Sequence, residues 1–217
     1  MDILLQLVDF VLHLPVHLDE LVTNYGTWIY VILFLIVFCE TGLVVMPLLP
    51  GDSLLFAAGA LAAAGRLDPV LLCVLLIIAA ILGNAVNYWV GRLAGTELQR
   101  RFPGLIRQQY LDKTHAYFER YGGKTIVIAR FVPIVRTVAP FAAGIGRMSH
   151  LRYQGYNVAG SMLWVLLLVP AGYFFANVPL VRDNFSAVVV AIILLSIMPA
   201  VVEFLRARRA GPPEHSR

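Results

Sequence analysis

Charged residues and cysteines are scarce in this sequence, and each shortage excludes a class of protein. Asp, Glu, Lys and Arg together make up 14% of the 217 residues, whereas hydrophobic residues make up 59%. Because soluble domains carry about 25% charged residues, this balance excludes a single soluble core and predicts a membrane protein. The two cysteines, Cys39 and Cys73, lie in apolar segments, which excludes a disulfide framework or a cysteine-based metal site.

The N-terminal region lacks two features of a removable signal peptide, a basic first segment and a small-residue cleavage site. We therefore expect the apolar segments themselves to direct the chain to the membrane. Polar residues recur at helical spacing among apolar ones in this region. They are Asp2, Gln6, Asp9, His13 and His17. This narrow polar stripe predicts an amphipathic helix over residues 1–24 that lies at the membrane interface.

Four apolar segments are long enough to cross a bilayer, which takes about 20 helical residues. Three of them contain no Asp, Glu, Lys or Arg: Val70–Val90, Val158–Val181 and Phe185–Val202. The fourth, Trp28–Leu49, is interrupted only by Glu40. The sequence therefore predicts an all-α integral membrane protein with about four transmembrane helices.

The apolar segment Leu54–Ala64 has about half the length of a span and follows a break rich in proline and glycine. The break contains Pro47, Pro50 and Gly51. This pattern predicts a re-entrant hairpin, which enters and leaves the membrane on one side. Broken backbone at membrane depth must be buried in protein or face a water-filled cavity, since lipid cannot satisfy its amide groups. We therefore expect a cavity beside the break, lined by Asn84 and Asn87 of the next helix.

A second interrupted segment, Thr125–Gly146, repeats the first and predicts a second re-entrant hairpin. Its interruptions are Arg130, Pro133, Arg136 and Pro140. When the two interrupted segments are aligned on their prolines, Met46–Gly59 and Val132–Gly144 both end in Phe-Ala-Ala-Gly. Corresponding broken segments in two halves of a chain are typical of inverted-repeat transporters with a site near the membrane midplane.

Basic residues concentrate in the loop 92–124 and in the tail after residue 205, and the positive-inside rule makes both regions cytoplasmic. Counting crossings back from a cytoplasmic C-terminus places the two hairpins on opposite membrane faces. The loop also carries an amphipathic pattern that predicts a second interfacial helix. The chain thus divides into an interfacial helix (1–24), a membrane transport domain (25–205) and a basic cytoplasmic tail (206–217). Basic residues that flank spans favour anionic lipid as their partner over nucleic acid, for which there is no motif.

Four charged residues lie inside otherwise apolar membrane segments: Glu40, Asp52, Arg130 and Arg136. Each costs about 2.5–3.5 kcal/mol at the centre of a span, so they must pair or meet water. Guanidinium groups match phosphate oxygens, and we expect Arg130 and Arg136 to bind a phosphate. Glu40 and Asp52 are then proton carriers, whose protonation loosens their hold on the arginines. The alternative is that the four residues form two buried ion pairs, which only fix the packing of the hairpins. Buried ion pairs, however, add little net stability.

Several short motifs carry a family resemblance. They are Phe38–Gly42, Pro47–Asp52, Gly91-Arg92, Tyr110–Lys113 and Ala129–Arg136. Together they resemble the DedA family of bacterial inner-membrane proteins over nearly the whole chain. The resemblance implies two opposed re-entrant hairpins, movement of lipids between leaflets and dependence on the proton motive force.

The implied substrate is a polyprenyl phosphate such as undecaprenyl phosphate, with phosphatidylethanolamine as another candidate. The resemblance also places the family's acidic pair on Glu40 and Asp52 and its arginine pair on Arg130 and Arg136. Many relatives carry Asp in a G-D-x-x-x-Y element where this chain has Asn84. That departure leaves the proton stoichiometry open.

The residues together with the family resemblance favour a proton-coupled transporter of a lipid phosphate in the bacterial inner membrane, with membrane lipids and protons as its other partners. An energy-independent phospholipid scramblase is the alternative. An enzyme is disfavoured because the hairpins contain no histidine and no metal-ligand cluster, and we expect no cofactor and no metal. A passive scaffold would tolerate a charge-neutral replacement such as Glu40→Gln. The lipid, the direction of transport and the oligomeric state, a homo-oligomer included, stay open.

Overall fold

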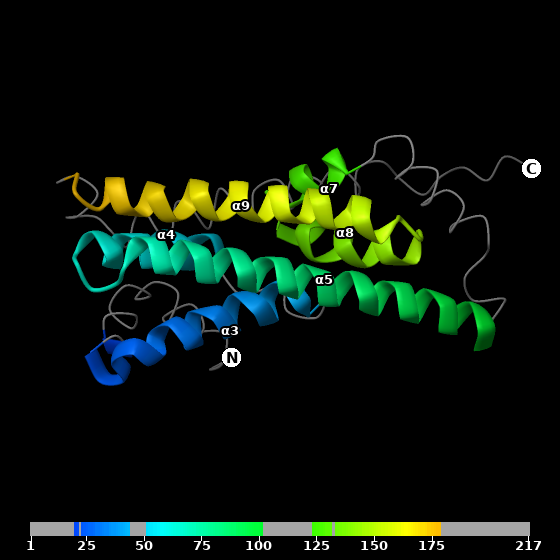
Figure 1. The fold of residues 1–217 in the computed structure, drawn as a ribbon, viewed down its shortest axis with the longest axis horizontal. Helices are drawn as coiled ribbons and strands as arrows, with labels where there is room; N and C mark the ends of the chain where they lie inside the picture. Colours follow the sequence, from blue (N-terminus) through cyan, green and yellow to red (C-terminus); the bar gives the residue numbers. More distant parts are fainter. Residues whose placement is uncertain (1–19, 22, 44–50, 102–122, 132, 179–217) are drawn as a thin grey trace, which may run out of the picture.

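The computed structural model describes residues 20, 21, 23–43, 51–101, 123–131 and 133–178 (Figure 1). Within these ranges the regular structure is helical, and the longest helices run side by side along one axis of a bundle. The helices are η1 (Gly26–Trp28), α3 (Ile29–Gly42), α4 (Gly51–Ala63), α5 (Pro69–Arg101), α7 (Lys124–Ala129), α8 (Pro133–Ile145) and α9 (His150–Phe175).

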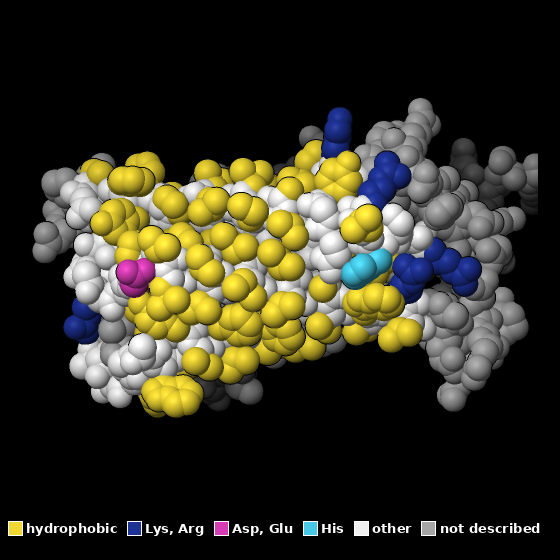
Figure 2. All heavy atoms as spheres, viewed as in Figure 1, with side chains coloured by type: hydrophobic (Ala, Val, Ile, Leu, Met, Phe, Trp, Pro, Cys, Tyr) yellow, Lys and Arg dark blue, Asp and Glu magenta, His cyan; other side chains and the backbone are white. Residues whose placement is uncertain are grey.

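Three helical stretches are long and apolar enough to cross a membrane: Thr23–Gly42, Pro69–Ala94 and His150–Phe175. Apolar side chains cover the middle of the bundle, and the coloured charged side chains lie toward its two ends (Figure 2). The prediction of an all-α membrane protein is therefore confirmed. The predicted span Phe185–Val202, most of the predicted helix 1–24 and the basic tail lie outside the described residues.

Helix α5 begins where its sequence predicts but extends further than expected. Pro69 occupies the first helical position, where a missing N–H group has no cost. The Asp68 carboxylate accepts a hydrogen bond from the backbone N–H of Leu71 at 2.7 Å and so caps the helix. We expected the helix to end near Gly91, yet it continues to Arg101. Residues 92–101 contain no proline to stop it.

The first hairpin consists of α3 and α4. At one end of the bundle, the Tyr30 hydroxyl at the start of α3 accepts a hydrogen bond from the N–H of Asp68, beyond the end of α4, at 2.7 Å. At the other end of the two helices, Glu40 of α3 and Asp52 of α4 both contact Arg136. Both helices therefore extend from the same end of the bundle to the charged cluster at its centre.

These boundaries differ from the prediction of a span over Trp28–Leu49 followed by a hairpin within Leu54–Ala64. Helix α3 ends at Gly42, and α4 is a single unbroken helix. Helix α4 contains no proline, and its interior Gly59 packs against α9 instead of ending the helix. The half-length apolar segment is thus the single helix α4, while the predicted span corresponds to Thr23–Gly42, which is long and apolar enough to cross a membrane.

The second hairpin consists of α7 and α8. Helix α7 ends at Ala129 and α8 begins at Pro133, so the predicted break beside Arg130 is confirmed. Arg136 and Pro140, which we expected to interrupt the segment as well, lie inside α8 without ending it. Helix α8 runs from the centre of the bundle toward the opposite end from α4 (Figure 1). The two hairpins therefore open toward opposite ends.

Glycines allow α4 and α8 each to touch the backbone of a long helix. A β-carbon added at any of four positions would collide with a carbonyl oxygen of the neighbouring helix. The contacts are Gly59 with Val169, Gly172 with Phe56, Gly91 with Phe141 and Gly144 with Tyr88. The first two join α4 to α9, and the last two join α8 to α5. Both copies of Phe-Ala-Ala-Gly therefore pack in the same way, each against a long helix.

Candidate functional site

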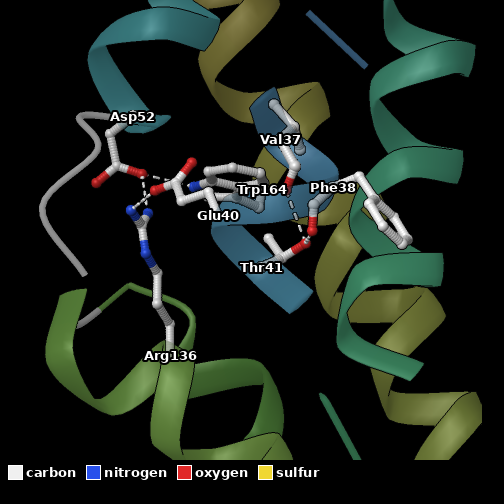
Figure 3. Close-up of polar contacts among 7 residues, drawn as sticks. All are labelled: Val37, Phe38, Glu40, Thr41, Asp52, Arg136 and Trp164. Atoms are coloured by element: carbon white, nitrogen blue, oxygen red, sulfur yellow. Dashed lines mark hydrogen bonds and ion pairs between the residues drawn. The ribbon is translucent and has the colours of Figure 1, made fainter. Parts of the chain in front are cut away.

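The inner ends of the two hairpins meet at a buried cluster of charges (Figure 3). Arg136 of α8 donates a hydrogen bond from Nη1 to Asp52 Oδ1 at 2.9 Å, and its Nη2 pairs with Glu40 Oε1. The side chains of Arg136, Glu40 and Asp52 are 9%, 1% and 17% exposed. One arginine of the second hairpin thus holds both predicted acids of the first.

Arg130, the other predicted arginine, is held differently. Its residue is 5% exposed, and its Nε and Nη2 atoms have no hydrogen-bond partner among the described residues. Its guanidinium carbon lies 4.8 Å from the centre of the Trp164 ring, within the range of a cation–π interaction. Arg130 therefore presents buried donors that no described carboxylate occupies.

Trp164 is a central residue of the cluster that the sequence analysis did not identify. Its indole Nε1 donates a hydrogen bond to Asp52 Oδ1 at 2.8 Å, and its ring also lies 5.6 Å from the Arg136 guanidinium carbon. One signal was available. Tryptophan in spans favours the headgroup level, whereas Trp164 lies inside the apolar segment Val158–Val181, where its N–H group needs a buried partner.

Gly51, expected only as part of a helix break, shapes the acidic side of the cluster. It is the first residue of α4, and a β-carbon at this position would collide with the Glu40 carboxylate. Glycine therefore lets the positive end of the α4 dipole approach that carboxylate. The other predicted break residues of this hairpin, Pro47 and Pro50, lie outside the described residues.

Asn84 and Asn87 have separate tasks. Asn84 lines the predicted cavity and donates a hydrogen bond to Asn157 Oδ1 of α9 at 3.0 Å. Asn87 instead donates from Nδ2 to two backbone carbonyls, Thr41 at 3.2 Å and Thr137 at 2.8 Å. Thr41 belongs to α3 and Thr137 to α8, so one amide group of α5 ties the two hairpins together.

A small cavity lies inside the cluster. Its lining includes Glu40, Asn84, Arg130, Arg136, Pro140 and Trp164. The space open to the centre of a water molecule is about 10 Å³, which is room for roughly one water. This volume is smaller than a phosphate group. The described residues also contain no group of three or more His, Cys, Asp or Glu that could hold a metal ion.

Long apolar helices around a charged cluster define an integral membrane protein with a polar interior site, and sequence comparison identifies its family. The VTT domain matches residues 49–174. The chain is 56% identical to protein DedA of Escherichia coli (strain K12) over 214 residues, which cover 97% of this chain and 98% of that protein. The chain belongs to the DedA family, as its motifs predict.

More distant relatives are membrane proteins by name. The chain is 39% identical over 194 residues to an uncharacterized membrane protein of Mycobacterium tuberculosis (strain ATCC 25618 / H37Rv), covering 86% of this chain and 83% of that protein. It is 33% identical over 171 residues to inner membrane protein YqjA of Escherichia coli (strain K12), covering 78% of each chain. None of these names states a reaction. No solved structure matches the chain.

Proposed function

We propose that this protein is a transporter that moves a lipid phosphate, namely a polyprenyl phosphate such as undecaprenyl phosphate, across the membrane with proton coupling. The observation that carries the proposal is the unequal state of the two arginines. Arg130 is buried with open donors, while Arg136 beside it is held by Glu40 and Asp52. A phosphate matches both guanidinium groups and competes with the two carboxylates for Arg136.

The exchange at Arg136 supplies a means of coupling to protons. A proton on Glu40 or Asp52 removes the negative charge that holds Arg136, which frees its N–H donors for the phosphate. When the proton leaves, the carboxylate regains Arg136 and the phosphate is displaced. Because the acids and Arg136 belong to different hairpins, each exchange also joins or separates the inner ends of the hairpins.

The proposal also includes an arrangement of the chain in the membrane. We propose about four transmembrane helices, of which Thr23–Gly42, which contains α3, is one. The segments at α4 and at α7–α8 are re-entrant and form an inverted repeat, and amphipathic interfacial helices lie before and between the two halves. The name of the relative inner membrane protein YqjA supports the bacterial inner membrane as the location. The basic tail supports a cytoplasmic C-terminus. A transport role requires no catalytic group, so the protein is not an enzyme in this proposal.

A reconstituted flip assay tests the proposal. Purified protein in phosphatidylcholine vesicles should move a fluorescent polyprenyl monophosphate between leaflets. Arg130→Ala should abolish that movement, and Arg130→Lys should restore little of it, because a point charge lacks the bidentate donors. Arg152→Ala, an exposed arginine on α9, is the matched control. Normal lipid movement in both Arg130 variants would refute the proposal that Arg130 binds the headgroup.

A pH gradient across the vesicle membrane distinguishes the proposed transporter from the alternative function, an energy-independent phospholipid scramblase. A proton-coupled transporter accumulates the labelled lipid in one leaflet when a gradient is imposed, and loses this bias in Glu40→Gln. A scramblase only equalises the leaflets, whatever the gradient. Equal distribution of both polyprenyl phosphate and phosphatidylethanolamine under a gradient would favour the scramblase.

A further inference from the structure

Arg130 and Arg136 are buried side by side but are balanced by different chemical groups. Arg136 contacts two carboxylates. Arg130 lies 4.8 Å from the centre of the Trp164 ring, and its Nε and Nη2 have no hydrogen-bond partner among the described residues. An isolated buried cation is costly, so the nature of what lies against Arg130 matters for its function.

A carboxylate and an aromatic ring hold a guanidinium group in different ways. A carboxylate accepts hydrogen bonds from the N–H groups and so occupies the donors that a phosphate would use. An aromatic ring attracts the cation through its electron-rich face and takes up no oxygen-directed donor. The ring therefore offsets part of the cost of burial while the N–H donors of Arg130 stay available.

We propose that Trp164 is a positioning residue that keeps Arg130 as an open anion receptor, so that Arg130 binds the headgroup first and Arg136 joins it only after leaving the acids. This inference rests on the proposed function, since it assigns the order of binding at the same site. It also narrows the ligand to a headgroup oxyanion with at least two oxygens, because two donors of Arg130 are open.

The indole N–H adds a second task. Trp164 Nε1 donates to Asp52 Oδ1 at 2.8 Å, the oxygen that also accepts from Arg136 at 2.9 Å. When Arg136 turns to the ligand, Asp52 keeps this hydrogen bond. Trp164 thus lowers the cost of releasing Arg136, and its ring remains within reach of both guanidinium groups.

A spectroscopic experiment reports on Trp164 directly. The chain contains three tryptophans, and the other two, Trp28 and Trp89, are 68% and 44% exposed. In the Trp28→Phe/Trp89→Phe variant, farnesyl monophosphate should change the emission of Trp164 in a saturable way, and farnesol should not. A phosphate-dependent change that persists in Arg130→Ala, or no change in a protein that transports normally, would overturn the inference.

Transport kinetics supply a second readout. Trp164→Leu removes the ring and the N–H group, and should raise the half-saturating concentration of a fluorescent polyprenyl monophosphate about tenfold. Trp164→Phe keeps the ring and should restore saturation to within about threefold of the wild type while slowing the maximal rate. The matched control is Trp89→Leu, which removes a surface tryptophan beside Arg92 and should change neither.

The outcomes separate the two proposals. If Arg130→Ala abolishes transport but both Trp164 variants saturate like the wild type, the role of Trp164 is refuted and the proposed function stands. If Arg130→Ala also transports normally, the proposed function falls. If Trp164→Leu does not fold, the single-tryptophan titration and Trp164→Phe decide the question.

Discussion

The substitution Arg136→Leu gives the sharpest test of the charge cluster, because it removes the partner of two acids at once. The Glu40 side chain is 1% exposed, and its Oε2 already lacks a hydrogen-bond partner among the described residues. Breaking a buried ion pair by deleting one partner costs about 3–5 kcal/mol, since the remaining charge stays buried. Asp52 contributes less of this cost, because its side chain is 17% exposed and it keeps the hydrogen bond from Trp164.

A second substitution should repair most of the damage. In Glu40→Gln/Arg136→Leu the uncompensated charge of Glu40 is gone, and replacing both members of a buried pair is often neutral for stability. We therefore expect the double variant to regain more than half of the lost stability. Transport should stay abolished in it, because Arg136, the arginine proposed to bind phosphate, is still missing.

Thermal unfolding in detergent measures both effects. A loss of 1 kcal/mol lowers Tm by about 2–4 °C in a chain of this size, so Arg136→Leu should lower it by about 6–20 °C. Lys124→Leu, at an exposed position of α7, should change stability by less than about 0.5 kcal/mol. A double variant no more stable than Arg136→Leu would refute the argument, because it would show that the Glu40 charge is not the source of the cost.

Three further changes test the packing around the cluster. Gly51→Val should abolish flipping in vesicles, because its side chain collides with the Glu40 carboxylate; normal flipping would contradict the close approach of α4. Gly144→Leu should lower Tm through a collision with the α5 backbone that costs at least about 1–3 kcal/mol, whereas Gly155→Leu, with open space around it, should not. Asn87→Asp replaces the two donors that join the hairpins with acceptors and should cost about 1–3 kcal/mol in thermal unfolding; an unchanged Tm would exclude that clamp.

Much of the cluster follows from the sequence through one physical rule, the cost of charge inside a membrane. That rule selects Glu40, Asp52, Arg130 and Arg136, and the structure brings all four to the inner ends of the hairpins. It does not determine which pairs form. Arg136 takes both acids, although it lies 96 residues from Glu40 and 84 from Asp52, and partners so distant in sequence are fixed only by packing.

The errors in the fold have a similar origin. The sequence predicts a span over Trp28–Leu49, whereas the structure gives a span-length helical stretch over Thr23–Gly42, because the apolar pattern does not show where the helix begins and ends. Trp164 was missed because its role lies in contacts with α4, α7 and α8, which the sequence of α9 does not reveal. Asn87 was predicted to line the cavity, and only the structure shows that its amide spans two hairpins.

The composition of the cluster also has a consequence for the electrical character of transport. Two arginines and two acids give +2 and −2, so the four side chains are together neutral when all are ionised. A phosphate monoester carries a charge of about −1.5 to −2 at pH 7. Binding it would leave the cluster with that net negative charge, which a low-dielectric site strongly disfavours. Protons taken up by Glu40 and Asp52 would return the occupied cluster to near neutrality. If the proposed function holds, we expect at most about two protons per lipid from these two acids, because they can neutralise a charge of up to about −2, and we expect the loaded form to rearrange with little dependence on membrane voltage.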